Sequence, residues 1–162
     1  MSFSIRDGQS EVTGDFSKLE ALVAALKEKH YVDIGVFATA KTGSGSPIAT
    51  YGAYNEFGSI KVKDRPPKRS FIRMPLSTGQ AKIAAYVAPR AKAHMEDGDV
   101  KAIFADIGIA GESVIQEAFG QRGPGWKENA ESTIKRKGSD APLIDDGMLR
   151  AAITSRVDGE SK

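Results

Sequence analysis

The residue types that most often carry out chemistry are sparse in this sequence. Cysteine is absent, so the chain has no thiolate nucleophile and no sulfur ligand for zinc. The two histidines, His30 and His94, have no second potential ligand at metal-site spacing, and we expect both to be solvated surface residues. We therefore predict no metal ion, no cofactor and no catalytic histidine.

Other candidate motifs for catalysis fail on the order or direction of their residues. The segment KTGSGS places Lys41 and Thr42 before its glycines, whereas a phosphate-binding loop places its lysine after them. Asp145 and Asp146 are adjacent, so in a strand they would face opposite ways, and capping of a helix explains at least one of them. No serine lies in a G-x-S-x-G context. These patterns predict a protein that is not an enzyme.

The most informative stretch is residues 51–73, YGAYNEFGSIKVKDRPPKRSFIR. Its first part is an aromatic-rich polar segment in which we expect NEFG to form a turn. Pro66 and Pro67 then favour extended backbone, which presents Phe71 between Arg69 and Arg73. An extended arm with an apolar anchor and charged flanks is typical of docking between chains.

The arm is also strongly basic, although the whole chain has a formal net charge of only +2. Against the single acid Asp64, its second half carries Lys61, Lys63, Arg65, Lys68, Arg69 and Arg73. These cations could serve solubility and local salt bridges, pair with carboxylates of a neighbouring subunit, or contact DNA phosphates. A small DNA-binding module that uses residues 61–73 is therefore the alternative hypothesis.

Periodicity predicts the elements that must position this arm. Alternating apolar residues favour strands at residues 3–6, 31–38 and 153–157. A helix capped by Asp15 should pack its apolar face on a sheet, and a second helix, capped by Ser77 or Thr78, should end or kink at Pro89. The longest amphipathic stretch opens at Asp99, and we expect it to be the central core helix.

Two glycines in that stretch, Gly108 and Gly111, predict close packing of a strand or neighbouring chain against the helix. We expect Trp126 to cover the edge of the core, one more turn at residues 133–137, and a short capped helix before the last strand. The fold class that follows is α+β, with a small curved antiparallel sheet packed on one long central helix, plus shorter helices. We expect one domain over residues 1–162, with a flexible loop at 39–50 and a docking arm at 51–73.

Three segments, taken in order, resemble the virion morphogenesis proteins of long-tailed bacteriophages, also described as tail-completion or neck proteins. They are YGAYNEFGS, RPPKRSFIR and WKENAESTIKRKGSDAPLIDDGMLRAAITSRV, which together span about two-thirds of the chain. The chain departs from the family pattern at Asp146, where a threonine is frequent, and at Lys68, which separates Pro67 from Arg69.

The resemblance implies a structural protein at the junction between the phage head and tail. It would form a homo-oligomeric ring, hexameric or alternatively dodecameric, and would join the head connector or adaptor to the tail terminator or tail tube, close to packaged DNA. It would reside in the virion after assembly in the host cytoplasm, and no apolar run in the chain is long enough for a membrane span. Its expected interface residues are Tyr54, Asn55, Glu56, Phe57, Gly58, Pro66, Pro67, Arg69, Phe71, Arg73, Asp146, Leu149 and Arg150.

Overall fold

A computed structural model describes residues 2–6, 9–13, 17–58, 67–120, 123 and 125–158. Its elements, in chain order, are β1 (Ser2–Arg6), β2 (Gln9–Thr13), α1 (Ser17–Lys27), β3 (Val32–Val36), α2 (Ile48–Phe57), α3 (Arg73–Thr78), α4 (Gln80–Asp97), α5 (Val100–Gly120), α6 (Glu131–Lys137), α7 (Met148–Ala151) and β4 (Ile153–Val157). The α+β fold class predicted from the sequence is confirmed.

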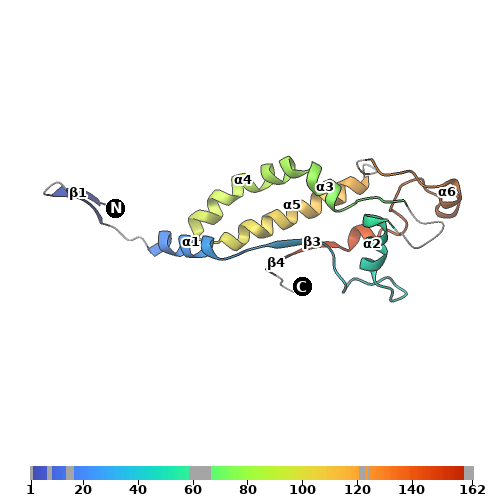
Figure 1. Cartoon of the computed structure of the whole chain (residues 1–162), viewed down its shortest axis with the longest axis horizontal. Coiled ribbons are helices and arrows are strands. Elements are labelled where there is room, and N and C mark those ends of the chain that lie inside the picture. The colour runs from blue at the N-terminus through green and yellow to red at the C-terminus, as the bar shows by residue number, and fades with distance from the viewer. Residues whose placement is uncertain are drawn as a thin grey trace.

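Helix α5 lies at the centre of the described part of the chain, between a helix and a sheet (Figure 1). On one side runs α4, and on the other lies the antiparallel pair of β3 and β4. The register pairs Val32 with Val157 and Val36 with Ile153, so the C-terminal strand returns alongside a strand far earlier in the chain. The first helical turn is capped as expected, because the amide of Ala102 donates to Oδ1 of Asp99 at 2.9 Å.

The two glycines of α5 allow the sheet to approach the helix backbone closely. A Cβ built on Gly108 would lie 2.8 Å from Cβ of Ser155 on β4, and one built on Gly111 would clash with Cδ1 of Ile34 on β3. Both glycines are buried. The predicted close packing of a strand on this helix is confirmed.

Replacing Gly108 by alanine should therefore lower the free energy of unfolding by about 1–3 kcal/mol, because the strand must move away from the helix. Gly120→Ala on the same helix is the matched control, since nothing lies within 4 Å of its Cβ position. The control should be neutral or stabilising by up to about 1 kcal/mol, the gain in helix propensity. Urea unfolding followed by circular dichroism measures both, and equal effects of the two variants would contradict the close approach.

The hydrophobic core continues from α5 towards the C-terminal half of the chain. Phe71 packs edge-on against Phe119 with ring centroids 5.8 Å apart, and Phe119 packs in the same way against Trp126 at 5.3 Å. The indole Nε1 of Trp126 donates to the carbonyl of Ser70 at 3.1 Å, so its one polar atom is satisfied. Leu149 of α7 is also fully buried. The prediction that Trp126 covers the edge of the core is confirmed.

Residues 39–50, predicted to be a flexible loop, are hydrogen-bonded within the chain. The amide of Thr42 donates to the carbonyl of Ser46 at 2.9 Å, and that of Ile48 donates to Ala40 at 3.0 Å. An isolated bridge joins Lys41 to Pro47, and residues 48–50 already belong to α2. The Thr42 hydroxyl forms hydrogen bonds with the Ser44 hydroxyl and with the Ser46 amide. These polar contacts hold the segment as a short hairpin, although it contains no apolar anchor.

One predicted helix start is wrong. Thr78 lies at the end of α3, where its hydroxyl donates to the carbonyl of Met74 at 3.0 Å, and the following helix starts after Gly79. That helix, α4, contains Pro89 and continues to Asp97, so of the two outcomes expected at Pro89, an end or a kink, the end does not occur. In contrast, the short turn predicted at residues 133–137 is present as α6.

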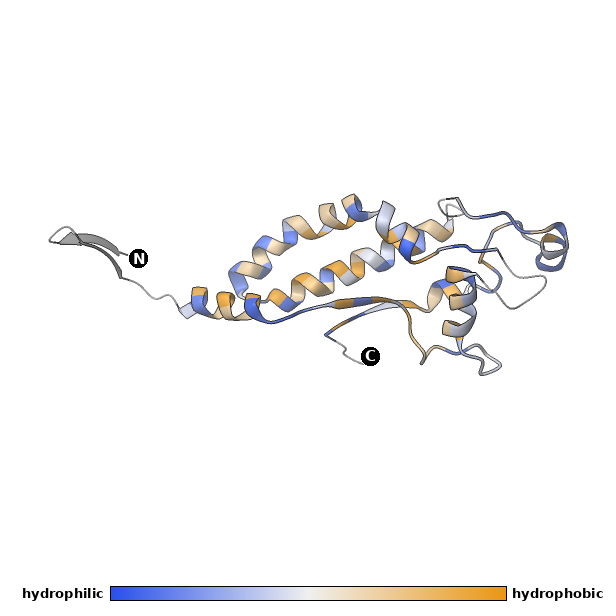
Figure 2. Cartoon of the chain, viewed as in Figure 1, coloured by the Kyte–Doolittle hydropathy of each residue, from blue (hydrophilic) through white to orange (hydrophobic). Residues whose placement is uncertain are grey.

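Helix α1 does not pack on a sheet as predicted. None of its residues is buried, and Leu19, Val23 and Leu26 remain 55%, 41% and 52% exposed. In Figure 2 the helix shows apolar turns at the end of β3 that lies away from α2. Its expected cap, Asp15, lies outside the described residues. The amphipathic pattern of α1 is thus real, but within the described chain only Leu22 of its apolar face is half-buried, while Leu19, Val23 and Leu26 remain exposed.

The two histidines are engaged in polar contacts rather than solvated as predicted. Nδ1 of His30 lies 2.9 Å from Oδ2 of Asp158, and Nε2 of His94 lies 3.0 Å from Oδ2 of Asp106. The first pair joins residues that are 128 positions apart, whereas the second joins the consecutive helices α4 and α5. Among the helices described, none is long and apolar enough to cross a membrane.

Candidate interaction surface

Helix α2 has a buried face and an opposite face that carries a row of exposed aromatic rings. Ile48, Gly52, Asn55 and Glu56 are buried, and a Cβ on Gly52 would come within 3.3 Å of Leu149. On the opposite face, Tyr51, Tyr54 and Phe57 are 43%, 52% and 63% exposed. Their spacing of three residues places them in one slanted row along the helix. Large exposed apolar groups at this density are typical of interaction sites.

The segment NEFG is therefore the end of a helix and not the turn that we predicted. Asn55 donates from its side-chain amide to the carbonyl of Tyr51 at 2.9 Å, inside the helix. Gly58 follows the helix with φ of 79°, a conformation that favours glycine, and packs on Lys68. Gly58 of this motif thus ends α2 directly after Phe57.

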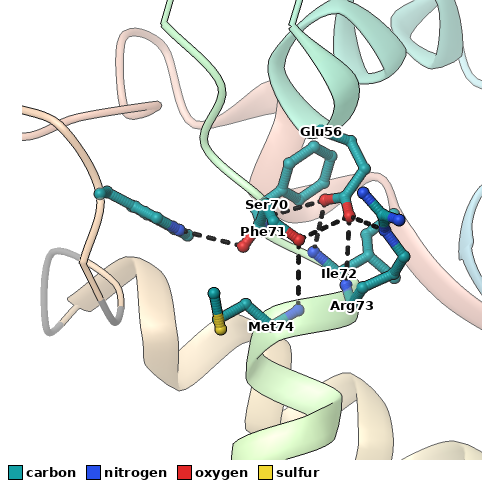
Figure 3. A network of polar contacts seen from close by, with 7 residues as sticks. Glu56, Ser70, Phe71, Ile72, Arg73 and Met74 are labelled. Carbon is teal, nitrogen blue, oxygen red and sulfur yellow. Dashed lines mark hydrogen bonds and ion pairs between the residues drawn. The ribbon is translucent and has the colours of Figure 1, made fainter.

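A buried carboxylate fastens α2 to the start of α3. Glu56 is only 3% exposed, and its two oxygens accept hydrogen bonds from the segment that precedes and begins α3 (Figure 3). The donors are Ser70 Oγ at 2.7 Å, the amides of Phe71, Ile72 and Arg73 at 2.7, 2.9 and 3.3 Å, and Arg73 Nε at 2.8 Å. Such a saturated carboxylate has no free lone pair directed at a substrate, so it acts as a structural fastener.

The electrostatics of Glu56 agree with this structural function. Burial pushes the pKa of Glu56 upward, but the hydrogen bonds from Arg73, from the Ile72 amide and from Ser70 outweigh burial. The net pKa lies below the ordinary value of 4.5. A general acid or base would require a pKa shifted towards neutrality instead.

The lowered pKa of Glu56 predicts a pH dependence of stability. Because the folded pKa is below the unfolded one, the contribution of Glu56 is fully present above about pH 4.5 and is lost as pH falls through the folded value. Thermal unfolding of the wild type and of Glu56→Gln should therefore differ by a constant amount near neutral pH. That difference should shrink in acid, and a gap that widens as pH falls would contradict the assignment.

Arg69 holds the other side of the same segment to the residues that follow Trp126. Its Nε donates to the carbonyl of Lys127 at 2.6 Å, and its Nη2 donates to the carbonyl of Glu128 at 2.8 Å and to Oδ1 of Asn129 at 3.1 Å. The Arg69 side chain is buried, and its backbone amide donates to the carbonyl of Asn55 at 2.8 Å. Residues 67–72 thus connect α2 to the C-terminal half through the buried side chains of Arg69 and Phe71, rather than forming a free docking arm.

A mostly apolar pocket of about 220 Å³ opens beside Phe57, at one end of the aromatic row. The residues that line it include Val36, Ala49, Ala53, Phe57, Ile72 and Arg73. The guanidinium carbon of Arg73 lies 4.8 Å from the centroid of the Phe57 ring, a cation–π arrangement that fixes both side chains at the surface. We define the docking face as this pocket together with Tyr51, Tyr54 and Phe57.

The structure separates the predicted interface residues into two groups. Tyr54, Phe57, Arg73, Asp146 and Arg150 are exposed, while Gly58 and Pro67 are half-buried. Asn55, Glu56, Arg69, Phe71 and Leu149 are buried within the chain, so we correct their assignment as exposed contacts. Pro66 lies outside the described residues. Asp146 caps as predicted, because its Oδ1 accepts from the amide of Met148 at 2.9 Å.

The sequence interpretation also missed Tyr51, which belongs to the docking face. The signal was available, since Tyr51, Tyr54 and Phe57 recur every three residues, but the segment was interpreted as a turn. Burial raises the pKa of the Tyr51 phenol, and the nearby carboxylates of Asp146 and Asp145 raise it further. The docking face thus has an acidic end at Tyr51 and a basic end at Arg73.

The basic cluster offers little to DNA in the described part of the chain. Lys61, Lys63 and Arg65 lie outside the described residues. Of the remaining three, Arg69 is buried against carbonyl oxygens and Arg73 is paired with Glu56, which leaves Lys68 exposed. The described cations of this cluster therefore contribute more to contacts within the fold than to contacts with DNA phosphates.

No group of three or more His, Asp and Glu side chains that could hold a metal ion occurs among the residues that the structure describes. Comparisons with protein-family models, with curated proteins and with solved structures found no match for this chain.

Proposed function

We propose that this protein is a structural subunit of a bacteriophage virion that assembles at the junction between head and tail. The ordered set of motifs in residues 51–59, 65–73 and 126–157 is the basis for the proposed family. The observation that carries the function is the docking face, because Tyr51, Tyr54 and Phe57 are exposed on a helix that Glu56 fixes rigidly. A preformed apolar surface on a rigid support suits assembly, since little side-chain entropy is lost on docking.

The elongated arrangement of the described helices also suits a joining protein. Helices α4 and α5 run side by side through the middle of the described chain, and α2, which carries the docking face, lies near one end of this pair (Figure 1). An assembly subunit requires stiffness between its contact surfaces and no catalytic centre. In this hypothesis the protein forms a ring and contacts the head connector on one side and the tail on the other.

The test is joining of heads and tails in a phage lysate that lacks this gene product. Negative-stain microscopy before and after addition of the purified protein should show separate full heads and finished tails that become complete virions. Phe57→Ser protein, in which one exposed ring is removed, should join them poorly. Normal virions in the lysate without the protein would contradict the proposed function.

The DNA-binding hypothesis makes a different prediction for the same protein. It requires binding of the isolated chain to duplex DNA with an affinity that falls steeply as salt is raised. Because Arg69 and Arg73 are engaged within the fold, we expect no such binding at physiological salt. Fluorescence anisotropy with a labelled duplex over a salt series measures this.

A further inference from the structure

Two apolar surfaces of this chain are uncovered, and they lie far apart in the same molecule. One is the docking face on α2, and the other is the row of Leu19, Val23 and Leu26 on α1. Figure 1 shows α1 and α2 at opposite ends of β3, so the two surfaces of one chain do not meet. A helix of eleven residues is marginally stable by itself, and this row contributes little to the burial of α1, so a cover over the row would stabilise the helix.

The two surfaces match in length and chemistry. The row on α1 extends over about 10 Å from Leu19 to Leu26, and the row on α2 over about 9 Å from Tyr51 to Phe57, at 1.5 Å per residue. Aliphatic side chains on one helix thus meet aromatic rings and an apolar pocket on the other. A pocket of about 220 Å³ has room for one aliphatic side chain, since an apolar cavity of about 150 Å³ admits benzene.

The charges beside the two rows are complementary in one orientation. On α2 the acidic end, with Asp145, lies at Tyr51, and the basic end, with Arg73, lies at Phe57. On α1, Glu20 and Lys27 share one flank of the row, because they are seven residues apart, with Glu20 beside Leu19 and Lys27 beside Leu26. Both are exposed. Antiparallel packing would bring Glu20 towards Arg73 and Lys27 towards Asp145.

We propose that the docking face of one copy of this chain binds α1 of a second copy, with the two helices antiparallel and Leu19 at the pocket beside Phe57. The contact joins two different surfaces, so each copy can bind one neighbour at either end. When this contact is repeated, the copies form a closed ring if the rotation between neighbours allows closure, and otherwise they form a filament. The inference deepens the proposed function, because it names the contact that would build its ring.

The first experiment is sedimentation velocity of the full chain over a range of concentrations. The wild type should associate, whereas Val23→Asp and Phe57→Ser should each raise the concentration required by at least about tenfold, as expected for loss of an apolar anchor. Ile109→Asp on α5 is the matched control, because Ile109 is 52% exposed but lies outside both surfaces. A monomeric wild type, or equal weakening by the control, would overturn the proposal.

Mixing the two variants tests the head-to-tail geometry. Val23→Asp keeps an intact docking face, and Phe57→Ser keeps an intact α1, so an equimolar mixture should form heterodimers and nothing larger. If α1 paired with α1, or one docking face with another, the variant that keeps that surface should form dimers by itself. Mixing the two variants should then produce no additional association. That second result would overturn the pairing of α1 with α2.

Charge exchange tests the orientation. Lys27→Glu and Asp145→Lys should each weaken association, and the double variant should recover it. Lys18→Glu makes the same charge change on the opposite flank of α1, because nine residues of helix place Lys18 about 180° around the axis from Lys27, and it should leave association unchanged. A double variant no better than either single one, or an effect of Lys18→Glu equal to that of Lys27→Glu, would overturn the antiparallel arrangement.

The two proposals can fail separately. If the purified chain associates as described but does not join heads to tails, the proposed function fails and the contact stands. If Val23→Asp joins heads to tails at the wild-type level, the contact fails and the proposed function stands.

Discussion

Phe71→Ala is expected to lower the free energy of unfolding by about 3–5 kcal/mol, as is typical when a fully buried phenylalanine is truncated. The ring is 1% exposed and lies between Phe119 and the backbone of α2, where the aromatic stack continues to Trp126. Its removal leaves a cavity at the place where α2 and α5 meet. Urea unfolding, with the fluorescence of the only tryptophan as the probe, measures the loss.

Phe57→Ala is the matched control for that experiment. The same ring is removed from the same motif, but Phe57 is 63% exposed, so the free energy of unfolding should change by less than about 0.5 kcal/mol. Phe57→Ala should instead weaken association between copies. If Phe71→Ala left stability unchanged and blocked assembly alone, the docking arm predicted from the sequence would be restored.

Glu56→Ala should destabilise the fold by about 3–5 kcal/mol, because each buried donor left without an acceptor costs about 1–3 kcal/mol and several donors lose theirs together. The carboxylate satisfies three backbone amides and the Ser70 hydroxyl, and the variant leaves these donors without an acceptor. Arg73 loses less, because its side chain is 58% exposed and can be hydrated. Thermal unfolding at neutral pH measures the effect.

The control for Glu56 is Glu117, whose carboxylate accepts from Lys82 at 2.7 Å on the surface. Both members of that pair are substantially exposed, so Glu117→Ala should change stability by at most about 1 kcal/mol. Similar losses in the two variants would show that burial does not distinguish the two carboxylates. Refolding yield of Glu56→Ala adds a second measure, since the junction of α2 and α3 would be poorly defined.

Together these predictions divide the motif of residues 54–73 into two functions. Glu56, Arg69 and Phe71 hold the fold, and Phe57 with its aromatic neighbours forms the surface. Mutation of the first group would lower the stability of the fold, whereas mutation of Phe57 would weaken association between copies. Stability and association measured on the same variants separate the two.

The amino-acid sequence by itself determined the elements whose periodicity is strong. The alternation in residues 31–38 and 153–157 identified β3 and β4, and Asp99 marked the start of α5. The glycine pair in α5 even predicted the close approach of a strand, because only a missing Cβ permits it. These features depend on local spacing, which the sequence displays directly.

Only the tertiary structure decided which way the polar and aromatic residues of 51–73 point. Glu56 and Arg69 have side chains that normally remain in water, and they are buried because donors and acceptors distant in sequence converge on them. The donors to Glu56 are fourteen to seventeen residues away, and the acceptors for Arg69 are about sixty. Local patterns do not record such convergence, so burial of these charges, and exposure of Phe57 beside them, follows only from the packing of α2 against α7 and β3.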